Sequence, residues 1–245
     1  MLETKIFRYK KLKSTNTKLK ELQSVERLPE FSIVITDNQT NGRGQHGNFW
    51  ESEKNKNLTF SVLLYPHFIE IKHQFNIAII ITVALVDVLK KYLINVKIKW
   101  PNDIYAYDKK ISGILIENSI IGDKIDYSVV GIGLNVNQLQ FVSDAKNPVS
   151  MKILTGKEFD AKLLLHEIIT EIIARYSQCV EHGFKNIQNQ YHENLYWINE
   201  AHTFKDENGI FQGKIELVEE TGHLVMTDSE NNRRKYAFKE IEFLQ

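Results

Sequence analysis

Apolar residues in the first part of the chain fall into short runs, which predict strands, and longer runs, which predict helices. The strand-like runs are rich in β-branched and aromatic residues and lie between turn residues. Those runs cover residues 31–36, 58–64, 96–100, 111–117 and 127–136. The last two flank a turn at Gly122-Asp123, and so short a connection favours antiparallel neighbours.

Four helices are expected before, between and after these strands. Ser14-Thr15-Asn16 precedes leucines at helical spacing, and a serine or threonine there is a good N-cap. Residues 70–93 predict a long helix whose isoleucine- and valine-rich centre is buried on most faces. Residues 160–182 and 184–194 carry a further apolar stripe with helical spacing.

The pattern changes after about residue 197. Strand-like runs at 214–218, 224–227 and 236–243 alternate with turn signals such as Asn208-Gly209. The sequence therefore predicts an α+β fold with two parts. The first, residues 1–196, holds a mixed, largely antiparallel sheet with helices, and the second, residues 197–245, is a small β-barrel.

Composition narrows the class of protein. The chain of 245 residues carries 31 acidic and 31 basic side chains, which argues against a large nucleic-acid surface. The longest apolar run, 77–86, is too short to span a bilayer. A single cysteine, Cys179, permits no internal disulfide and fits a reducing cytoplasm. We expect a cytoplasmic protein that binds neither nucleic acid nor membrane.

A glycine-rich loop at residues 38–50 carries the strongest chemical signal. Gly42, Gly44 and Gly47 spell G-x-G-x-x-G. A dinucleotide-binding fingerprint needs a helix directly after the glycines, but a polar stretch and a strand follow here. The other segments of a protein kinase are absent. The loop therefore offers a backbone that approaches a ligand closely, with Arg43 available for an anion.

Three other segments are candidates for chemistry. Lys99-Trp100-Pro101-Asn102-Asp103 suits a hydrated Mg²⁺ beside substrate phosphates, or else an Asx-stabilised turn. Lys110, near Gly113, is either solvent-exposed or the holder of a carboxylate or phosphate. Two glycines inside the strand-like segment 131–137 indicate close approach by a ligand or backbone, or a bulge.

Taken together, these segments resemble the serial motifs of the biotin protein ligase family, the biotin–[acetyl-CoA-carboxylase] ligases. The similar segments, in order, are Ser14-Thr15-Asn16, residues 36–50, 99–103, 110–117 and 131–137. The resemblance extends over nearly the whole chain. It implies a biotin/lipoate ligase-like catalytic domain over residues 1–196 and an SH3-like domain over residues 197–245.

The resemblance also implies an ATP-dependent reaction in two steps. Biotin and Mg²⁺·ATP first give biotinyl-5′-AMP, and biotin then passes to one lysine of a biotin carboxyl carrier domain. The implied catalytic residues are Arg43 and Lys110. The implied biotin-binding residues are Ser14, Thr15, Asn16, Gln39, Gly42, Arg43, Gly44, Gln45, Lys110 and Gly113. The implied ATP-binding residues are Arg43, Lys99, Asn102, Lys110, Asn135 and Phe141, with Asn102 and Asp103 near Mg²⁺.

Two departures from the family pattern stand out. The familiar glycine loop reads G-R-G-R-R-G, whereas Gln45 and His46 replace its second and third arginines, which removes positive charge near the adenylate. Ser14 comes so early that we expect no helix-turn-helix domain before it and no operator binding. Such a ligase acts as a monomer or homodimer. The alternatives are a lipoate protein ligase and a non-catalytic biotin sensor.

Overall fold

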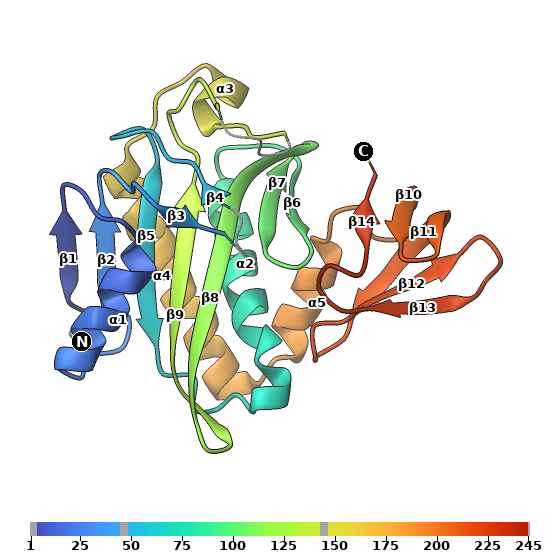
Figure 1. Cartoon of the computed structure of the whole chain (residues 1–245), viewed down its shortest axis with the longest axis horizontal. Coiled ribbons are helices and arrows are strands. Elements are labelled where there is room, and N and C mark those ends of the chain that lie inside the picture. The colour runs from blue at the N-terminus through green and yellow to red at the C-terminus, as the bar shows by residue number, and fades with distance from the viewer. Residues whose placement is uncertain (1–3, 45–48, 143–146, 245) are drawn as a thin grey trace.

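A seven-stranded sheet forms the centre of the first part of the chain in the computed structural model, which describes residues 4–44, 49–142 and 147–244 (Figure 1). The strand order is β1-β2-β5-β9-β8-β7-β6. The bounds are β1 Ile6–Tyr9, β2 Ile33–Thr36, β5 Leu58–Leu64, β6 Val96–Lys99, β7 Asp103–Ala106, β8 Lys109–Ile121 and β9 Lys124–Leu134. Only β1 and β2 pair in parallel, so the predicted mixed, largely antiparallel sheet is confirmed.

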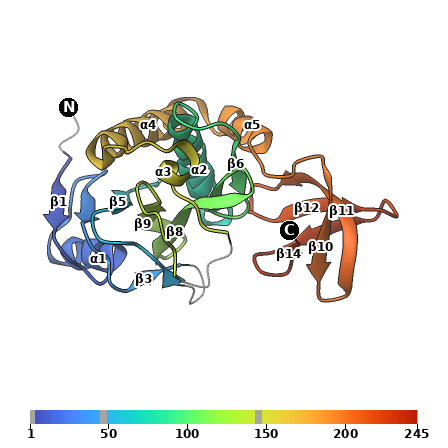
Figure 2. The ribbon, with the colours of Figure 1, turned by 90° about the horizontal axis from the view of Figure 1, so that it is seen from above.

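The two faces of this sheet are covered by different elements (Figure 2). Helices α2, α4 and α5 lie over one face, while α1 and the small hairpin of β3 and β4 lie over the other. The bounds are α1 Thr15–Val25, α2 Phe75–Leu89, α3 Met151–Thr155, α4 Ala161–His182, α5 Lys185–Glu193, β3 Gly42–Arg43 and β4 Phe49–Trp50. The predicted α+β class is thereby confirmed.

Strand β2 shows how side-chain alternation builds two cores. Successive strand residues point to opposite faces of a sheet. Ile33 and Ile35 join the large core beneath α2 and α4, whereas Val34 joins a smaller cluster with Leu19 of α1. The residues on both faces of β2 are therefore buried, which explains its continuous apolar sequence.

Helix α2 is the centre of the large core. Every residue of this helix except Asp87 is buried. The stretch Ile71–Leu89 is long and apolar enough to cross a membrane, but most of it is buried inside the fold. Its composition is that of a core helix packed between the sheet and the neighbouring helices.

Several element predictions hold and others need correction. Ser14 is the N-cap of α1, and its hydroxyl accepts a hydrogen bond from the Thr17 N–H at 3.4 Å. The expected helix over 70–93 is shorter, Phe75–Leu89, after a 3-10 turn at Ile71–His73. Asp103, in the segment for which an Asx-stabilised turn was one interpretation, is the first residue of β7. The expected strand over 236–243 was wrong, because a turn separates the strands that end at Tyr236 and begin at Glu242.

The chain after residue 200 folds as a five-stranded antiparallel sheet in the order β13-β12-β11-β10-β14. The bounds are β10 Ala201–Asp206, β11 Gly209–Val218, β12 Leu224–Asp228, β13 Arg233–Tyr236 and β14 Glu242–Phe243. This C-terminal sheet docks beside β6 and β7. The buried Trp100 indole N–H donates to the Gly222 carbonyl at 2.9 Å, and the Trp100 ring meets Phe238 with centroids 5.2 Å apart.

Trp100→Phe tests this docking contact. The variant keeps an aromatic ring against Phe238 but leaves the buried Gly222 carbonyl without its donor. We expect the free energy of unfolding to fall by about 1–3 kcal/mol, measured by urea denaturation. Tyr107→Phe, which alters an exposed aromatic side chain, serves as the control and is expected to change little. Equal stability of the Trp100→Phe variant and the unmodified protein would contradict the structural role of this hydrogen bond.

Candidate active site

A cavity of about 240 Å³ opens where the N-terminus of α1, the glycine loop, and strands β7, β8 and β9 meet. Most of the residues predicted for the site line it. These are Ser14, Thr15, Asn16, Gln39, Arg43, Gly44, Asn102, Asp103, Lys110 and Gly113. Trp50, Gly131, Gly133 and Lys239 also line the cavity and were not in the predicted set. Segments separated by up to about two hundred residues thus share one pocket.

Glycines in two paired strands form the floor of this cavity. Gly113 of β8 lies opposite Gly133 of β9, and the Trp50 ring lies flat over both. A Cβ at Gly113 would stand 3.0 Å from the indole, and a Cβ at Gly133 would overlap it. The glycines are therefore explained by close approach, not by a bulge. The buried Trp50 indole N–H has no hydrogen-bond partner among the described residues.

Gly131 gives the same kind of access to Asn16. A Cβ at this glycine would overlap the Asn16 amide oxygen. The Asn16 amide nitrogen donates to the Leu115 carbonyl at 3.2 Å and to Glu117 at 2.8 Å, and its oxygen accepts from Ser61 at 2.6 Å. Asn16 is 3% exposed, so its amide is held in place by the protein.

Thr15 and Gln39 form the adjoining wall. The Thr15 N–H donates to the Gln39 side-chain oxygen at 2.9 Å, which fixes the start of α1 against the segment before the glycine loop. The Gln39 amide nitrogen lies against Gly42, where a Cβ would stand 2.8 Å away. Polar groups of Ser14, Thr15 and Gln39 consequently gather at one end of the cavity.

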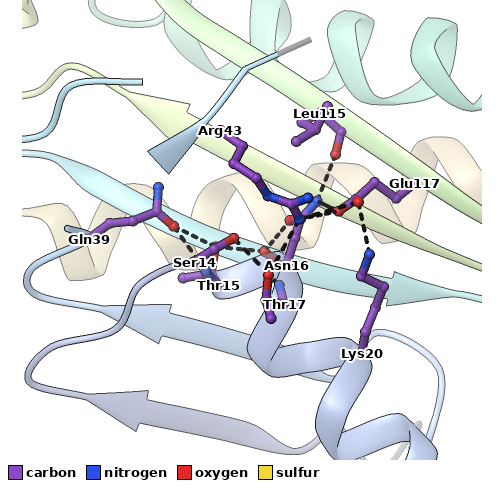
Figure 3. Close-up of polar contacts among 10 residues, drawn as sticks. Ser14, Thr15, Asn16, Thr17, Lys20, Gln39, Arg43, Leu115 and Glu117 are labelled. Atoms are coloured by element: carbon purple, nitrogen blue, oxygen red, sulfur yellow. Dashed lines mark hydrogen bonds and ion pairs between the residues drawn. The ribbon is translucent and has the colours of Figure 1, made fainter. Parts of the chain in front are cut away.

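Glu117 is the centre of a polar network that sequence reasoning missed (Figure 3). Its carboxylate accepts hydrogen bonds from Asn16 at 2.8 Å, Lys20 at 2.8 Å and Arg43 at 3.1 and 3.2 Å. Burial raises the pKa of Glu117, but hydrogen bonds from Lys20 and Asn16 and the charge of Arg43 outweigh it, and the net pKa is lowered. The Glu117 carboxylate on β8 thereby binds side chains of both α1 and the glycine loop.

The second cation of the cavity is also paired. The Lys110 ammonium lies 2.7 Å from the Asp103 carboxylate and 5.7 Å from the centre of the Trp50 ring. The neighbouring Asn102 amide donates to the Ile114 carbonyl. Arg43 and Lys110, which both line the cavity, therefore each stand beside a carboxylate.

A further network fixes the chain beyond Trp50. Glu51 accepts from the Gln138 amide at 2.8 Å and from the Val142 N–H at 3.1 Å. Gln138 in turn accepts from the Glu53 N–H at 3.0 Å. The segment after β9 is thus tied to the segment that carries Trp50.

Four predicted site residues in the described part of the chain do not line the cavity, and a fifth, Gln45, lies outside the described residues. The Lys99 ammonium faces the rings of Tyr105 and Phe243, 4.6 and 5.0 Å from their centres, and so points toward the C-terminal sheet. Asn135 is buried, and its side-chain oxygen has no hydrogen-bond partner among the described residues. Gly42 and Phe141 also lie outside the cavity lining.

Metal ligands are sparse at this site. Among residues 4–44, 49–142 and 147–244, no cluster of three or more His, Cys, Asp or Glu side chains is arranged to hold a metal ion. Asp103 is the single carboxylate on the described cavity wall. One carboxylate fits a Mg²⁺ ion that takes its other ligands from water and substrate phosphates.

Glu117→Gln tests the network around Glu117. The glutamine keeps the shape of the side chain but removes the negative charge that pairs with both Lys20 and Arg43. We therefore expect the free energy of unfolding at pH 7 to fall by about 1–2 kcal/mol. Because the pKa of Glu117 is lowered from 4.5, this stabilisation is present above that value and is lost as the pH falls through the lowered pKa. Urea denaturation between pH 3 and pH 7 measures the difference.

Glu21→Gln is the matched control, because Glu21 forms an exposed ion pair with Lys18 on the same helix. We expect this variant to stay within about 0.5 kcal/mol of the unmodified protein. A Glu117→Gln effect of the same size at pH 3 and pH 7 would show that charge is not what holds the network together.

Comparison with known proteins agrees with this geometry. The model of the biotin/lipoate A/B protein ligase family matches residues 9–135, which is more than half of the chain. The bifunctional ligase/repressor BirA of Bacillus subtilis is 29% identical over 230 residues, covering 92% of this chain and 70% of that protein. The biotin–[acetyl-CoA-carboxylase] ligase of Paracoccus denitrificans is 26% identical over 226 residues, covering 87% of this chain and 91% of the relative.

A solved structure is similar over the full length. The biotin protein ligase from Aquifex aeolicus, in complex with biotin and ATP, superposes with a TM-score of 0.81 and 27% identity, covering 98% of this chain and 99% of that one. Both sheets are included in such a match. The chain therefore belongs to the biotin/lipoate A/B protein ligase family, as its sequence motifs predicted.

Proposed function

We propose that this protein is a biotin protein ligase that makes biotinyl-5′-AMP from biotin and ATP and then transfers biotin to a lysine of a carrier domain. The observation that carries the proposal is one cavity that gathers Ser14, Thr15, Gln39, Arg43 and Lys110 over a glycine floor. Its similarity to the Aquifex aeolicus ligase, whose structure holds biotin and ATP, supports the choice of substrates.

The chemistry explains why such a site needs two cations. In the first step a carboxylate oxygen of biotin forms a bond to the α-phosphorus of ATP, and pyrophosphate leaves with the electron pair of the broken P–O bond. In the second step the lysine amine attacks the acyl carbon, and AMP leaves. The first step brings two anions together, so fixed positive groups stabilise the charge that develops between them.

Arg43 and Lys110 are the proposed source of that positive charge. Lys110 lies beside the Trp50 ring on the glycine floor, so a carboxylate seated over that floor meets its ammonium. Its partner, Asp103, keeps the ammonium within the cavity when no substrate anion is present. Arg43 is held by Glu117 on the α1 side, where it orders the glycine loop and adds positive charge.

The polar wall of the cavity at the start of α1 is the proposed ureido pocket. The biotin ureido group has N–H donors and a carbonyl acceptor, and buried groups of this kind need partners. Ser14, Thr15 and Gln39 present hydroxyl and amide groups there. Asn16 is the positioning residue behind them, because its amide is already bonded to Leu115, Glu117 and Ser61.

ATP is proposed to bind on the side of Asn102 and Asp103. Mg²⁺, when bound, would neutralise phosphate charge, with Asp103 as its protein carboxylate and Asn102 beside it. The proposed reaction draws on ATP and biotin, which suits the cytoplasm, and the single cysteine, Cys179, is buried and free.

Isotope exchange between ATP and pyrophosphate tests the substrate choice. We expect exchange that depends on biotin and Mg²⁺ and that lipoate does not support, because the ureido pocket carries polar groups that the lipoate ring leaves unpaired. Exchange that depends on lipoate and not on biotin would assign the protein to the lipoate branch of its family.

Lys110→Ala tests the proposed catalytic cation. Removing a preorganised charge at the reacting centre is expected to slow exchange by about 10²–10³-fold. The backbone bonds of residue 110 to Asn147 and Val149 are kept, so the melting temperature should change little. Lys109→Ala is the matched control, because Lys109 is adjacent and exposed. Near-normal exchange in the Lys110 variant would show that Lys110 has no catalytic role.

A further inference from the structure

We propose that Lys239, supplied by the C-terminal domain, binds the β- and γ-phosphates of ATP at the mouth of the cavity. This inference rests on the proposed function and names a residue that the sequence motifs do not include. Within the described chain, Lys239 is the single residue beyond position 200 that lines the cavity. The rest of the lining comes from the segment between Ser14 and Gly133.

The turn that carries Lys239 is anchored on both sides. The Ala237 N–H donates to the Glu240 carboxylate at 2.6 Å, and the Glu240 N–H donates back to the Ala237 carbonyl at 3.3 Å. Between them, Phe238 meets Trp100 with ring centroids 5.2 Å apart and Phe75 with centroids 6.0 Å apart. The turn is therefore held against Trp100, the residue that precedes Pro101 and Asn102, on the proposed nucleotide side.

The backbone conformation of Lys239 is unusual for a lysine. Its φ of 74° lies in the left-handed region, where glycine is the unstrained residue. Non-glycine residues held in such conformations cluster at ligand-binding and active sites, where the surrounding structure compensates the strain. A lysine in this left-handed conformation therefore indicates that its side chain has a function.

The charge balance of the cavity identifies the kind of ligand. Lys110 is paired with Asp103, and Arg43 shares the Glu117 carboxylate with Lys20, so each of these two cavity cations has a carboxylate partner. Among residues 4–44, 49–142 and 147–244, no ion pair or hydrogen bond engages the Lys239 ammonium, which is exposed. Unlike Arg43 and Lys110, Lys239 therefore lines the cavity with an ammonium that no carboxylate of the described residues pairs.

A polyphosphate is the anion that fits this placement. Lys239 lines the same cavity as Asn102 and Asp103. Its neighbour in the turn, Phe238, lies with Pro101 and Asn102 around an adjoining hollow, which puts the turn on the side proposed for ATP. A lysine ammonium binds phosphate as a point charge on a flexible stem. Placed there, it attracts the β- and γ-phosphates in the ground state and the departing pyrophosphate after the P–O bond breaks.

Three substitutions in the full chain test the proposal. Lys239→Ala removes the charge, Lys239→Arg keeps it, and Lys239→Gly removes it while relieving the left-handed backbone. We expect the KM for ATP and for pyrophosphate in biotin-dependent exchange to rise about tenfold in the Ala and Gly variants, equal to about 1.4 kcal/mol. The Arg variant should stay within about threefold, and kcat and biotin affinity should be unchanged in all three.

The Gly variant separates binding from folding. It is expected to be at least as stable as the unmodified protein and yet to bind ATP more weakly, which a purely structural role for Lys239 does not produce. Lys214→Ala is the matched control, because Lys214 is an exposed lysine of the same sheet that does not line the cavity. AMP, which lacks both outer phosphates, should inhibit every variant equally.

Unchanged KM values for ATP and pyrophosphate in the Ala and Gly variants would overturn the proposal. A rise confined to the KM for the carrier domain would also overturn it and would assign Lys239 to carrier docking. If the unmodified protein shows no biotin-dependent exchange, the proposed function itself has failed. Calorimetric binding of Mg²⁺·ATP then still tests Lys239, since the Gly variant should bind more weakly than the unmodified protein.

Discussion

Strands β8 and β9 lack side chains at three neighbouring positions, and the whole site depends on the space that this leaves. Gly113 and Gly133 admit the Trp50 indole to the surface of the sheet, and Gly131 admits the Asn16 amide. Any Cβ at Gly131 or Gly133 would occupy volume that these groups now fill. The glycines therefore set how deep the cavity is and which side chains form its walls.

Charge is the second element of the design, and the charges of Arg43 and Lys110 are paired within the protein. Each of the two cations on the glycine floor stands beside a carboxylate, Arg43 beside Glu117 and Lys110 beside Asp103. A cation without such a partner repels its like neighbours and has no fixed position, whereas a paired cation is already in place when a substrate anion arrives. In this arrangement the carboxylates position the cations, and the substrate anions compete with those carboxylates for the cations.

Much of this could be predicted from the sequence, because the strongest signals are local. The buried helix α2 follows from a long apolar run interrupted by Thr82, and the cap at Ser14 from its position before the first leucines. Strand β1, Ile6–Tyr9, was missed, since it is a four-residue edge strand with exposed and half-buried side chains and no apolar run. The turn at 237–241 was missed because Phe238 looks like a strand residue but is used for docking.

In the site, too, residues within short sequence motifs could be predicted, whereas residues whose partners are distant in the sequence could not. Residues inside short motifs, such as Gln39, Arg43 and Lys110, were found by resemblance and do line the cavity. Glu117 ends one of those motifs, but its role depends on partners about 100 residues away along the chain. Lys239 has no motif at all, and only the docking of the C-terminal sheet brings it to the cavity mouth. Lys99 belongs to one of the motifs, but its ammonium faces the aromatic rings of Tyr105 and Phe243, a position that its neighbours in the sequence do not reveal.

Mass spectrometry of a biotin carboxyl carrier domain after incubation with this protein, biotin and Mg²⁺·ATP tests the account most directly. The account predicts one biotinyl group on a single lysine of the carrier, with none when ATP is omitted. A carrier that stays unmodified, while the protein itself binds biotin, would contradict the account and identify a biotin-binding protein without ligase activity.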